Sequence, residues 1–223
     1  MRTASSLASS FGLHSVAMQL DHILIAVTDL AAVAEEFEAR YGLASVAGGH
    51  HPGWGTANRI VPLGETYLEL VAVIDEDEAA ESVFGRWVAG GAAKAGRLLG
   101  WAVRTDDLDA VARRLGLAAR SGSRAGPDGK LLRWRSAGIE EAAADPSLPF
   151  FIEWPSGGTF PGRSAAPQPG AITMLVLRGD PDRLSSWLGN HRLPISVEPG
   201  SPAVTGLILA GPRGESIIGT RRP

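Results

Sequence analysis

The stretch Tyr67–Val71 reads YLELV and the stretch Phe150–Trp154 reads FFIEW, so a single glutamate lies inside each apolar run. Short runs of aliphatic and aromatic residues are typical of β-strands. A carboxylate inside such a strand costs free energy unless a partner compensates its charge. Because this cost occurs twice, at the ends of two similar segments, we predict that Glu69 and Glu153 share one role.

The two similar segments each begin with a strand and a helix. The first opens with the aliphatic run Asp21–Val27, and the second opens with Leu98–Arg104. Apolar residues at helical spacing follow both runs, and residues 107–115 match residues 29–37 at a constant offset of 78 (107 − 29). Short strands then lead to each glutamate. Each segment is therefore predicted to be a β-α-β-β-β module.

Residues that favour helix ends flank the predicted helices. Asp29, Asp107 and Asp180 stand where an N-cap side chain would accept backbone N–H bonds. Gly42 and Gly116 stand where the first two helices would end in the left-handed conformation that glycine adopts at low cost. These residues therefore predict where the helices begin and end.

The predicted fold class is α+β, with repeated β-α-β-β-β modules that form a cupped mixed sheet. Two modules are complete, and a partial third follows a linker rich in proline, glycine and alanine. The predicted boundaries are 1–17 for a flexible N-terminal tail, 18–155 for the paired modules (20–74 and 98–155), 156–170 for the linker and 171–223 for the partial third module. A helix over 78–93 is predicted to connect the two complete modules.

The composition is that of an ordinary globular chain, with 44% hydrophobic and 20% charged residues among 223. The net charge of −3 gives no reason to expect nucleic acid or an anionic membrane as a partner. The absence of cysteine excludes disulfides, thiolate metal sites and cysteine nucleophiles. No apolar run approaches the ~18 residues that span a bilayer. We therefore expect a cytoplasmic protein.

Modules with a histidine on the first strand and a glutamate on the last resemble the vicinal oxygen chelate superfamily. That superfamily includes glyoxalase I, extradiol dioxygenases, methylmalonyl-CoA epimerase and antibiotic-resistance proteins. More narrowly, the chain looks like the glyoxalase-like domain proteins in the stretches Leu20–His22, His51–Asn58, Gly100–Trp101, Pro127–Gly129 and Pro149–Trp154. The resemblance implies that two modules pair so that their sheets form a cup.

The resemblance also implies metal ligands on the first and last strand of each module. The matching residues are His22 and Glu69 in the first module and Glu153 in the second. The fourth place falls on Gly100 or Trp101, neither of which binds a metal, so one of the usual four ligands is missing. One imidazole and two carboxylates would suit a divalent ion such as Zn, Ni, Mn, Fe or Mg, and a site without metal is the alternative. One of the glutamates would alternatively act as a general base.

The loop Gly48–Asn58 is the other unusual feature, because it contains four glycines, two histidines and a tryptophan. Its glycines could serve only to permit positive φ. In a functional interpretation, Trp54 is an apolar lid, and His51 and Asn58 make polar contacts with a substrate. Trp101 is assigned either to the substrate cup or to the core.

Structural roles remain open for the two glutamates. Side chains in Tyr67–Val71 alternate between two faces, and the pattern does not decide whether Glu69 points into the cup or into solvent. Glu153 could pair with Arg133 or Arg135 as a salt bridge. Both glutamates are nevertheless assigned to the site because they recur.

Two classes of function follow from these assignments. The first is a metal-dependent lyase or isomerase acting on a small oxygenated compound, which the paired glutamates favour. A dioxygenase is a weaker reading, because the extradiol enzymes of the superfamily use two histidines and one glutamate. The second is a metal-free protein that sequesters a small molecule, which the missing ligand favours. The expected partner is a small-molecule ligand, without nucleic acid or membrane, and a homodimer is left open.

Overall fold

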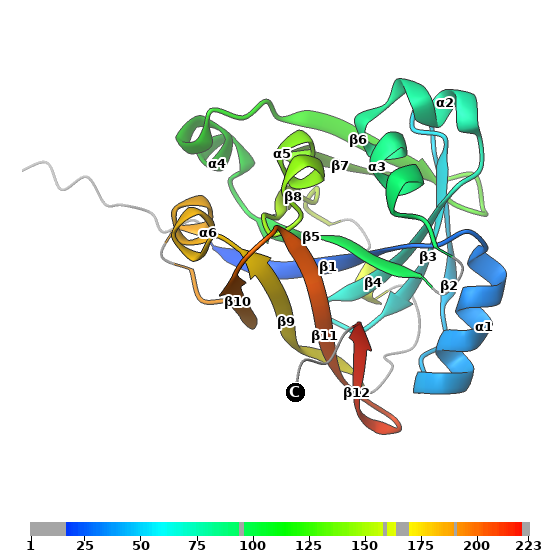
Figure 1. The fold of residues 1–223 in the computed structure, drawn as a ribbon. Helices are drawn as coiled ribbons and strands as arrows, with labels where there is room; N and C mark the ends of the chain where they lie inside the picture. Colours follow the sequence, from blue (N-terminus) through cyan, green and yellow to red (C-terminus); the bar gives the residue numbers. More distant parts are fainter. Residues whose placement is uncertain (1–16, 94–95, 158–159, 164–169, 190, 220–223) are drawn as a thin grey trace, which may run out of the picture.

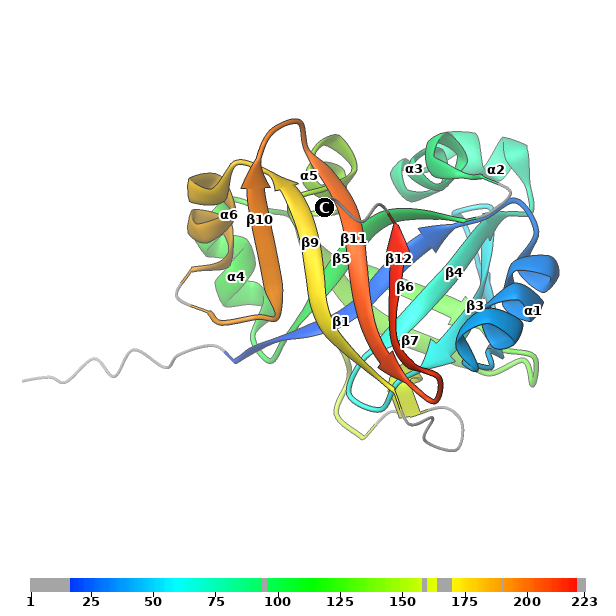
Figure 2. The same ribbon diagram turned by 60° about the horizontal axis from the view of Figure 1, so that its bottom comes forward.

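Eight strands of the chain close into a barrel, and four more form a second sheet that packs on its outside (Figures 1 and 2). The computed structural model describes residues 17–93, 96–157, 160–163, 170–189 and 191–219. The predicted N-terminal tail, apart from residue 17, therefore lies outside the described residues. The α+β class and the cup-like sheet are confirmed.

The barrel consists of two halves joined along their first strands. In chain order its strands are β1 (Met18–Ala26), β2 (Val46–His51), β3 (Thr56–Pro62), β4 (Tyr67–Val73), β5 (Arg97–Thr105), β6 (Arg120–Ala125), β7 (Leu131–Ala137) and β8 (Phe150–Glu153). Around the barrel the order is β1-β4-β3-β2-β6-β7-β8-β5. β1 runs parallel to β4 and β5 runs parallel to β8, whereas β1 and β5 are antiparallel to each other.

The structure describes six helices, and three of them begin at the aspartates that the sequence marks. They are α1 (Leu30–Tyr41), α2 (Glu76–Glu81), α3 (Val83–Gly91), α4 (Leu108–Leu115), α5 (Ile139–Ala144) and α6 (Pro181–Leu188). Asp29, Asp107 and Asp180 accept backbone N–H bonds at the starts of α1, α4 and α6. Gly42 and Gly116 end α1 and α4 with φ of 70° and 69°. The predicted caps are confirmed.

Side chains of the barrel strands alternate between its inside and its outside. On β1, Ile23 and Ile25 belong to the buried cluster outside the barrel, and Leu24 belongs to the cluster inside it. On β4, Leu68 lies outside, whereas Glu69 lies inside and lines a cavity. The direction of Glu69, which the sequence left open, is therefore inward.

The helices α3 and α5 fill much of the cup. Phe84 and Trp87 of α3 and Ala142 of α5 share one buried cluster with inner barrel residues such as Val71 and Phe150. Covering the concave face with two helices leaves only a small space between them and the polar side chains on the inner wall.

Neither of these helices matches the sequence prediction. The single helix predicted over 78–93 is wrong, because the chain breaks at Ser82, which has an extended backbone and caps α3 through the N–H of Gly85. Helix α5 was not predicted. It begins directly after Gly138, which has a φ of 88°, and its six residues are too few to show a periodic pattern.

The second sheet consists of β9 (Ala171–Gly179), β10 (Ile195–Pro199), β11 (Ala203–Gly211) and β12 (Gly214–Gly219), in the order β10-β9-β11-β12. This order differs from that of the barrel halves, in which the first strand lies beside the last. Here β9 pairs with β10 and β11. The segment predicted as a partial third module is therefore arranged in its own way, and β10 was not predicted.

The predicted linker lies between β8 and β9. Within the predicted linker the structure describes a 3-10 turn at Pro161–Arg163, while residues 158–159 and 164–169 lie outside the described residues. In the part of the chain that the structure describes, no helix has the length and apolarity to span a membrane.

Two glycines of the turn between β2 and β3 hold that turn against α2. The N–H groups of Gly53 and Gly55 donate to the carboxylate of Glu78 at 2.5 and 3.0 Å. Both glycines have positive φ, at 79° and 63°. A Cβ on Gly55 would lie 2.4 Å from backbone atoms of Asp75 and Ala79, whereas a Cβ on Gly53 would meet nothing within 4 Å.

We predict that Gly55→Ala destabilises the protein more than Gly53→Ala does. A left-handed alanine costs about 1–2 kcal/mol at either position. At Gly55 the clash with α2 adds about 1–3 kcal/mol, as overpacking usually does. Urea unfolding of the two variants measures the difference, and equal losses would show that Gly55 is not packed against α2.

Candidate functional site

A cavity of about 30 Å³ lies inside the barrel, between its inner wall and the helices α3 and α5. Aromatic residues form the largest group in its lining, and they are Trp54, Tyr67, Phe84, Trp134, Phe150 and Trp154. Its polar residues are His22, His51, Asn58, Glu69 and Arg124. The polar groups come from five strands, β1, β2, β3, β4 and β6. Residues from both halves of the barrel therefore contribute to one site.

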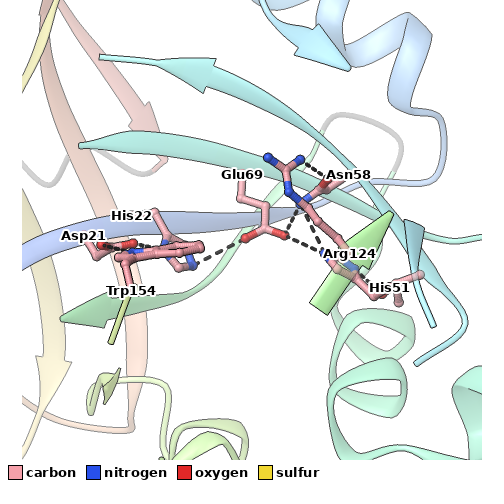
Figure 3. A network of polar contacts seen from close by, with 8 residues as sticks. Asp21, His22, His51, Asn58, Glu69, Arg124 and Trp154 are labelled. Atoms are coloured by element: carbon pink, nitrogen blue, oxygen red, sulfur yellow. Dashed lines mark hydrogen bonds and ion pairs between the residues drawn. The ribbon is translucent and has the colours of Figure 1, made fainter. Parts of the chain in front are cut away.

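The carboxylate of Glu69 lies at the centre of these polar groups (Figure 3). Its Oε1 accepts a hydrogen bond from Nδ2 of Asn58 at 2.7 Å. Its Oε2 lies 3.4 Å from Nε2 of His22, and its Oε1 lies 3.7 Å from Nε2 of His51. Glu69 is only 6% exposed, so these neighbours take the place of water around its charge.

Asp21 orients His22 through a break in the strand pairing. In the ladder between β1 and β5, Leu20 pairs with Val103 and His22 pairs with Ala102, so Asp21 is left without a partner. Such a bulge re-aims side chains. Oδ1 of Asp21 lies 2.6 Å from Nδ1 of His22.

This contact leaves Nε2 of His22 facing Glu69 (Figure 3). Asp21 is fully buried, and its Oδ2 also accepts a hydrogen bond from Nε1 of Trp154 at 2.9 Å. Several donors therefore hold the Asp21 carboxylate in place, and through it they hold the ring of His22.

Tyr67 packs on the other side of His22. The two rings are stacked, with centroids 4.6 Å apart. Burial raises the pKa of Tyr67 well above its usual value, and the negative charges of Asp21 and Glu69 raise it further. Tyr67 is therefore a neutral phenol that confines His22, and it is unsuited to act as a base.

His51 is held as a neutral ring. Its Nδ1 lies 2.8 Å from Oγ1 of Thr56, and its Nε2 lies 3.3 Å from Nδ2 of Asn58. Burial lowers the pKa of His51 to about 4, with a smaller lowering from the positive charge of Arg124, although Glu69 acts in the opposite direction. Because Asn58 presents an N–H to Nε2, the proton of the neutral ring is assigned to Nδ1, which donates to Thr56.

Arg124 completes the polar group and was missed by the sequence analysis. It lies on β6, is 9% exposed, and donates from Nη1 to Oδ1 of Asn58 at 3.2 Å. The strand Arg120–Ala125 reads RSGSRA, without the aliphatic residues that predict strands. An arginine in such a stretch gives no signal that it points into a cavity.

Five of the predicted site residues meet in this cavity. They are His22, His51, Trp54, Asn58 and Glu69. The loop residues that were assigned to one site therefore do lie side by side. Thr56 makes a contact with His51 that was not predicted. The substrate-binding and catalytic roles assigned to these residues remain predictions.

Glu153 does not join them, so the predicted convergence of His22, Glu69 and Glu153 is wrong. Oε2 of Glu153 accepts a hydrogen bond from Arg135 at 3.1 Å, and its Oε1 accepts one from the N–H of Leu108 at the start of α4. The reason is register. Phe150 and Ile152 are the residues of β8 that line the cavity, so the next residue points outward.

Trp101 is likewise outside the cavity. It is fully buried in the cluster that joins the barrel to the second sheet, together with Leu175 and Leu207. Its Nε1 donates to the carbonyl of Ser147 at 3.3 Å. Of the two roles that the sequence allowed for Trp101, the core role is the one that this position supports.

A comparison with known proteins supports the relationship that the sequence indicated. The family model described as a glyoxalase-like domain matches residues 20–192. The chain belongs to the glyoxalase-like domain family. This places it in the vicinal oxygen chelate superfamily, as expected from the sequence. No curated protein matches the chain.

The solved structures that are similar to this glyoxalase-like chain have low sequence identity to it, and one of them shares its fold. A hypothetical protein from Staphylococcus aureus covers 87% of this chain and 92% of its own, with a TM-score of 0.66 and 15% identity. A variant of Streptomyces coelicolor methylmalonyl-CoA epimerase, in complex with 2-nitronate-propionyl-CoA, covers 63% and 98%, with a TM-score of 0.45 and 22% identity. Methylmalonyl-CoA epimerase from Mycobacterium tuberculosis covers 61% and 86%, with a TM-score of 0.40 and 23% identity.

The glyoxalase-like fold implies a metal centre, but the residues present here do not fit one. Among the residues that the structure describes, no three His, Asp or Glu side chains are arranged to hold a metal ion. His22 and His51 approach different oxygens of Glu69, and an amide N–H of Asn58 already occupies one of these oxygens. Metal ligands would instead converge on one common point.

We predict that His51 makes the stability of the glyoxalase-like domain depend on pH. Between pH 6.5 and about 4 the unfolded chain binds a proton at His51 that the folded protein does not bind. The free energy of unfolding therefore falls as the pH falls through this range, by roughly 3 kcal/mol from this group. Urea unfolding at a series of pH values measures this dependence. As the pH is lowered through this range, the free energy of unfolding should fall less in His51→Gln than in wild type.

The neighbouring residue provides the control for this experiment. His50 is exposed, so His50→Gln should keep the wild-type dependence on pH. If His51→Gln also keeps it, then His51 is not held neutral by burial.

Proposed function

We propose that this glyoxalase-like protein is an enzyme that moves a proton on a small oxygenated molecule, as an isomerase or lyase does, with Glu69 as the general base. The observation that carries this proposal is the place of the Glu69 carboxylate, which is buried in the barrel, lines the cavity and is surrounded by polar side chains. A general base has to stand within hydrogen-bond reach of the proton that it removes. A molecule in the cavity would meet this carboxylate directly.

The neighbours of Glu69 suit a proton transfer that needs no metal. Asn58 holds Oε1, so Oε2 is the oxygen nearer to His22. His22 faces Oε2 with Nε2, while Asp21 orients its other nitrogen. A proton taken from the substrate by Glu69 could be passed to Nε2 of His22 or returned to a second atom of the substrate. A ligand that fills the cavity would displace water from these groups, which would strengthen their electrostatic interactions.

We further propose that the two halves of the barrel derive from one β-α-β-β-β module, and that the first half kept the catalytic groups. Both halves follow that order of elements, apart from the extra helix α5. On the first and last strands of the second half, residues facing the inside include Ala102, Phe150 and Ile152. The reaction would therefore take place against the first half, with the second half supplying Arg124 and an otherwise apolar wall.

The alternative function is sequestration of a small molecule without chemistry. The apolar wall of the second half and the aromatic lining favour it, since both suit binding and neither supplies a reactive group. In this case Glu69 would only receive a hydrogen bond from the ligand. The two functions differ in whether Glu69 is needed for turnover.

Exchange of carbon-bound hydrogen tests the enzyme function. Hydroxyacetone and pyruvate in D₂O are suitable probes, because each carries hydrogen next to a carbonyl and NMR follows its loss. We expect the wild-type protein, treated with chelator, to accelerate exchange of at least one probe. Glu69→Gln should lower that rate by about 100-fold or more, the usual contribution of a general base.

Glu153→Gln is the matched comparison for the same experiment. It should retain the wild-type exchange rate, because its carboxylate faces Arg135 and α4 on the outside of the barrel. An equal loss in both variants would contradict the assignment of the base to Glu69. Binding of a probe without exchange would favour sequestration, and exchange that requires added divalent metal would contradict the metal-free mechanism.

A further inference from the structure

Arg124 brings a positive charge into the barrel and leaves most of it unpaired. Its guanidinium has five N–H donors in a planar fork. Among the residues that the structure describes, its one hydrogen bond goes to the amide oxygen of Asn58, and it forms no ion pair. Among the described residues no fully buried side-chain nitrogen lacks a hydrogen-bond partner, so the other guanidinium nitrogens reach accessible space. A buried arginine that lines a cavity is therefore suited to pair with an anionic group in that cavity.

The backbone beside Arg124 is shaped to admit this side chain. A Cβ on Gly48 would lie 2.3 Å from Nη1 of Arg124 and 1.9 Å from Oδ1 of Asn58. Only glycine leaves the room in which these two groups meet. A side chain at residue 48 would require Asn58 and the far end of Arg124 to move, so Gly48 of β2 leaves room for the contact between them.

The position of Arg124 relative to Glu69 also matters. Asn58 stands between them, since its amide donates to Glu69 and accepts from Arg124 (Figure 3). The carboxylate of Glu69 therefore does not neutralise the guanidinium by direct contact. A ligand could place an anionic oxygen on Arg124 and a carbon next to its carbonyl near Glu69.

From this arrangement we infer that the ligand is a small monoanionic acid, a carboxylic or oxo acid with a short carbon chain, bound through Arg124. Arginine pairs with carboxylates through two parallel hydrogen bonds. The ligand has to be small because the cavity of about 30 Å³ has room for only about two or three waters of about 10–15 Å³ each. The aromatic lining would contact the short apolar part of such an acid.

Binding of matched acids and neutral molecules tests this inference. The probes are acetate against acetamide and pyruvate against hydroxyacetone, measured by calorimetry or ligand-observed NMR at low salt. We expect wild type to bind at least one acid more tightly than its neutral partner. Arg124→Met should lower the affinity for that acid by about 10- to 100-fold, the usual value of a charge-assisted pair. The affinity for the neutral partner should change by less than about 3-fold.

Two further variants distinguish a specific loss of binding from a loss caused by misfolding. Arg120→Met removes an exposed arginine from the same strand, and its affinity for the acid should equal that of wild type. Arg124→Lys keeps the charge and should retain part of the preference for the acid. The inference is wrong if no acid binds more tightly than its neutral partner, or if a folded Arg124→Met binds the acid as wild type does.

This inference rests on the proposed function for the place of the ligand, but the two fail in different ways. Binding is also measured in Glu69→Gln, in which proton exchange should be lost. An acid that binds through Arg124 without exchanging hydrogen contradicts the proposed enzyme and leaves the inference standing. Exchange of hydroxyacetone that is unchanged in Arg124→Met, without any preference for acids, contradicts the inference and leaves the enzyme standing.

Discussion

The burial of one carboxylate, that of Glu69, is the constraint on which the inside of the barrel depends. A charge removed from water requires polar partners, and those of Glu69 come from three other strands, as His22 on β1, His51 on β2 and Asn58 on β3. Asn58 also accepts a hydrogen bond from Arg124 on β6, in the other half of the barrel. Strands that are far apart in the sequence are thus joined around one group. Removing the carboxylate would leave the amide of Asn58 without its acceptor, so the packing of the barrel and the chemistry of its cavity share the same residues.

The sequence predicted well those features that depend on local physics. An aspartate and a glycine mark the two ends of α1 and of α4, because capping needs only a few neighbouring residues. The glyoxalase-like relationship followed from short motifs, and those motifs also brought His22, Glu69 and the loop residues to one site. What the sequence could not supply was register. Glu69 and Glu153 stand in similar apolar runs of the sequence, but in a strand a shift by one residue moves a side chain to the opposite face.

The other differences arise from contacts between distant segments. Arg124 lies in a strand of small and polar residues, and its inward direction follows from pairing with β2 and β7, which no local pattern records. Trp101 was placed in the core by the second sheet, whose strand order also differs from that of the barrel halves. Helix α5 packs beside α3 inside the cup. Tertiary packing of this kind overrides short-range patterns, and here it converts an open cup into a cavity of about 30 Å³.

The bulge at Asp21 shows how one irregular residue can determine the chemistry of a site. In a regular strand, Asp21 and His22 would point to opposite faces. Because Asp21 has no partner in the ladder with β5, its carboxylate reaches Nδ1 of the residue that follows it. The ring of His22 is then fixed with Nε2 toward Glu69. Two adjacent residues in a strand thereby act together on the cavity, and the extra residue in β1 is the structural reason that Nε2 of His22 is held toward Glu69.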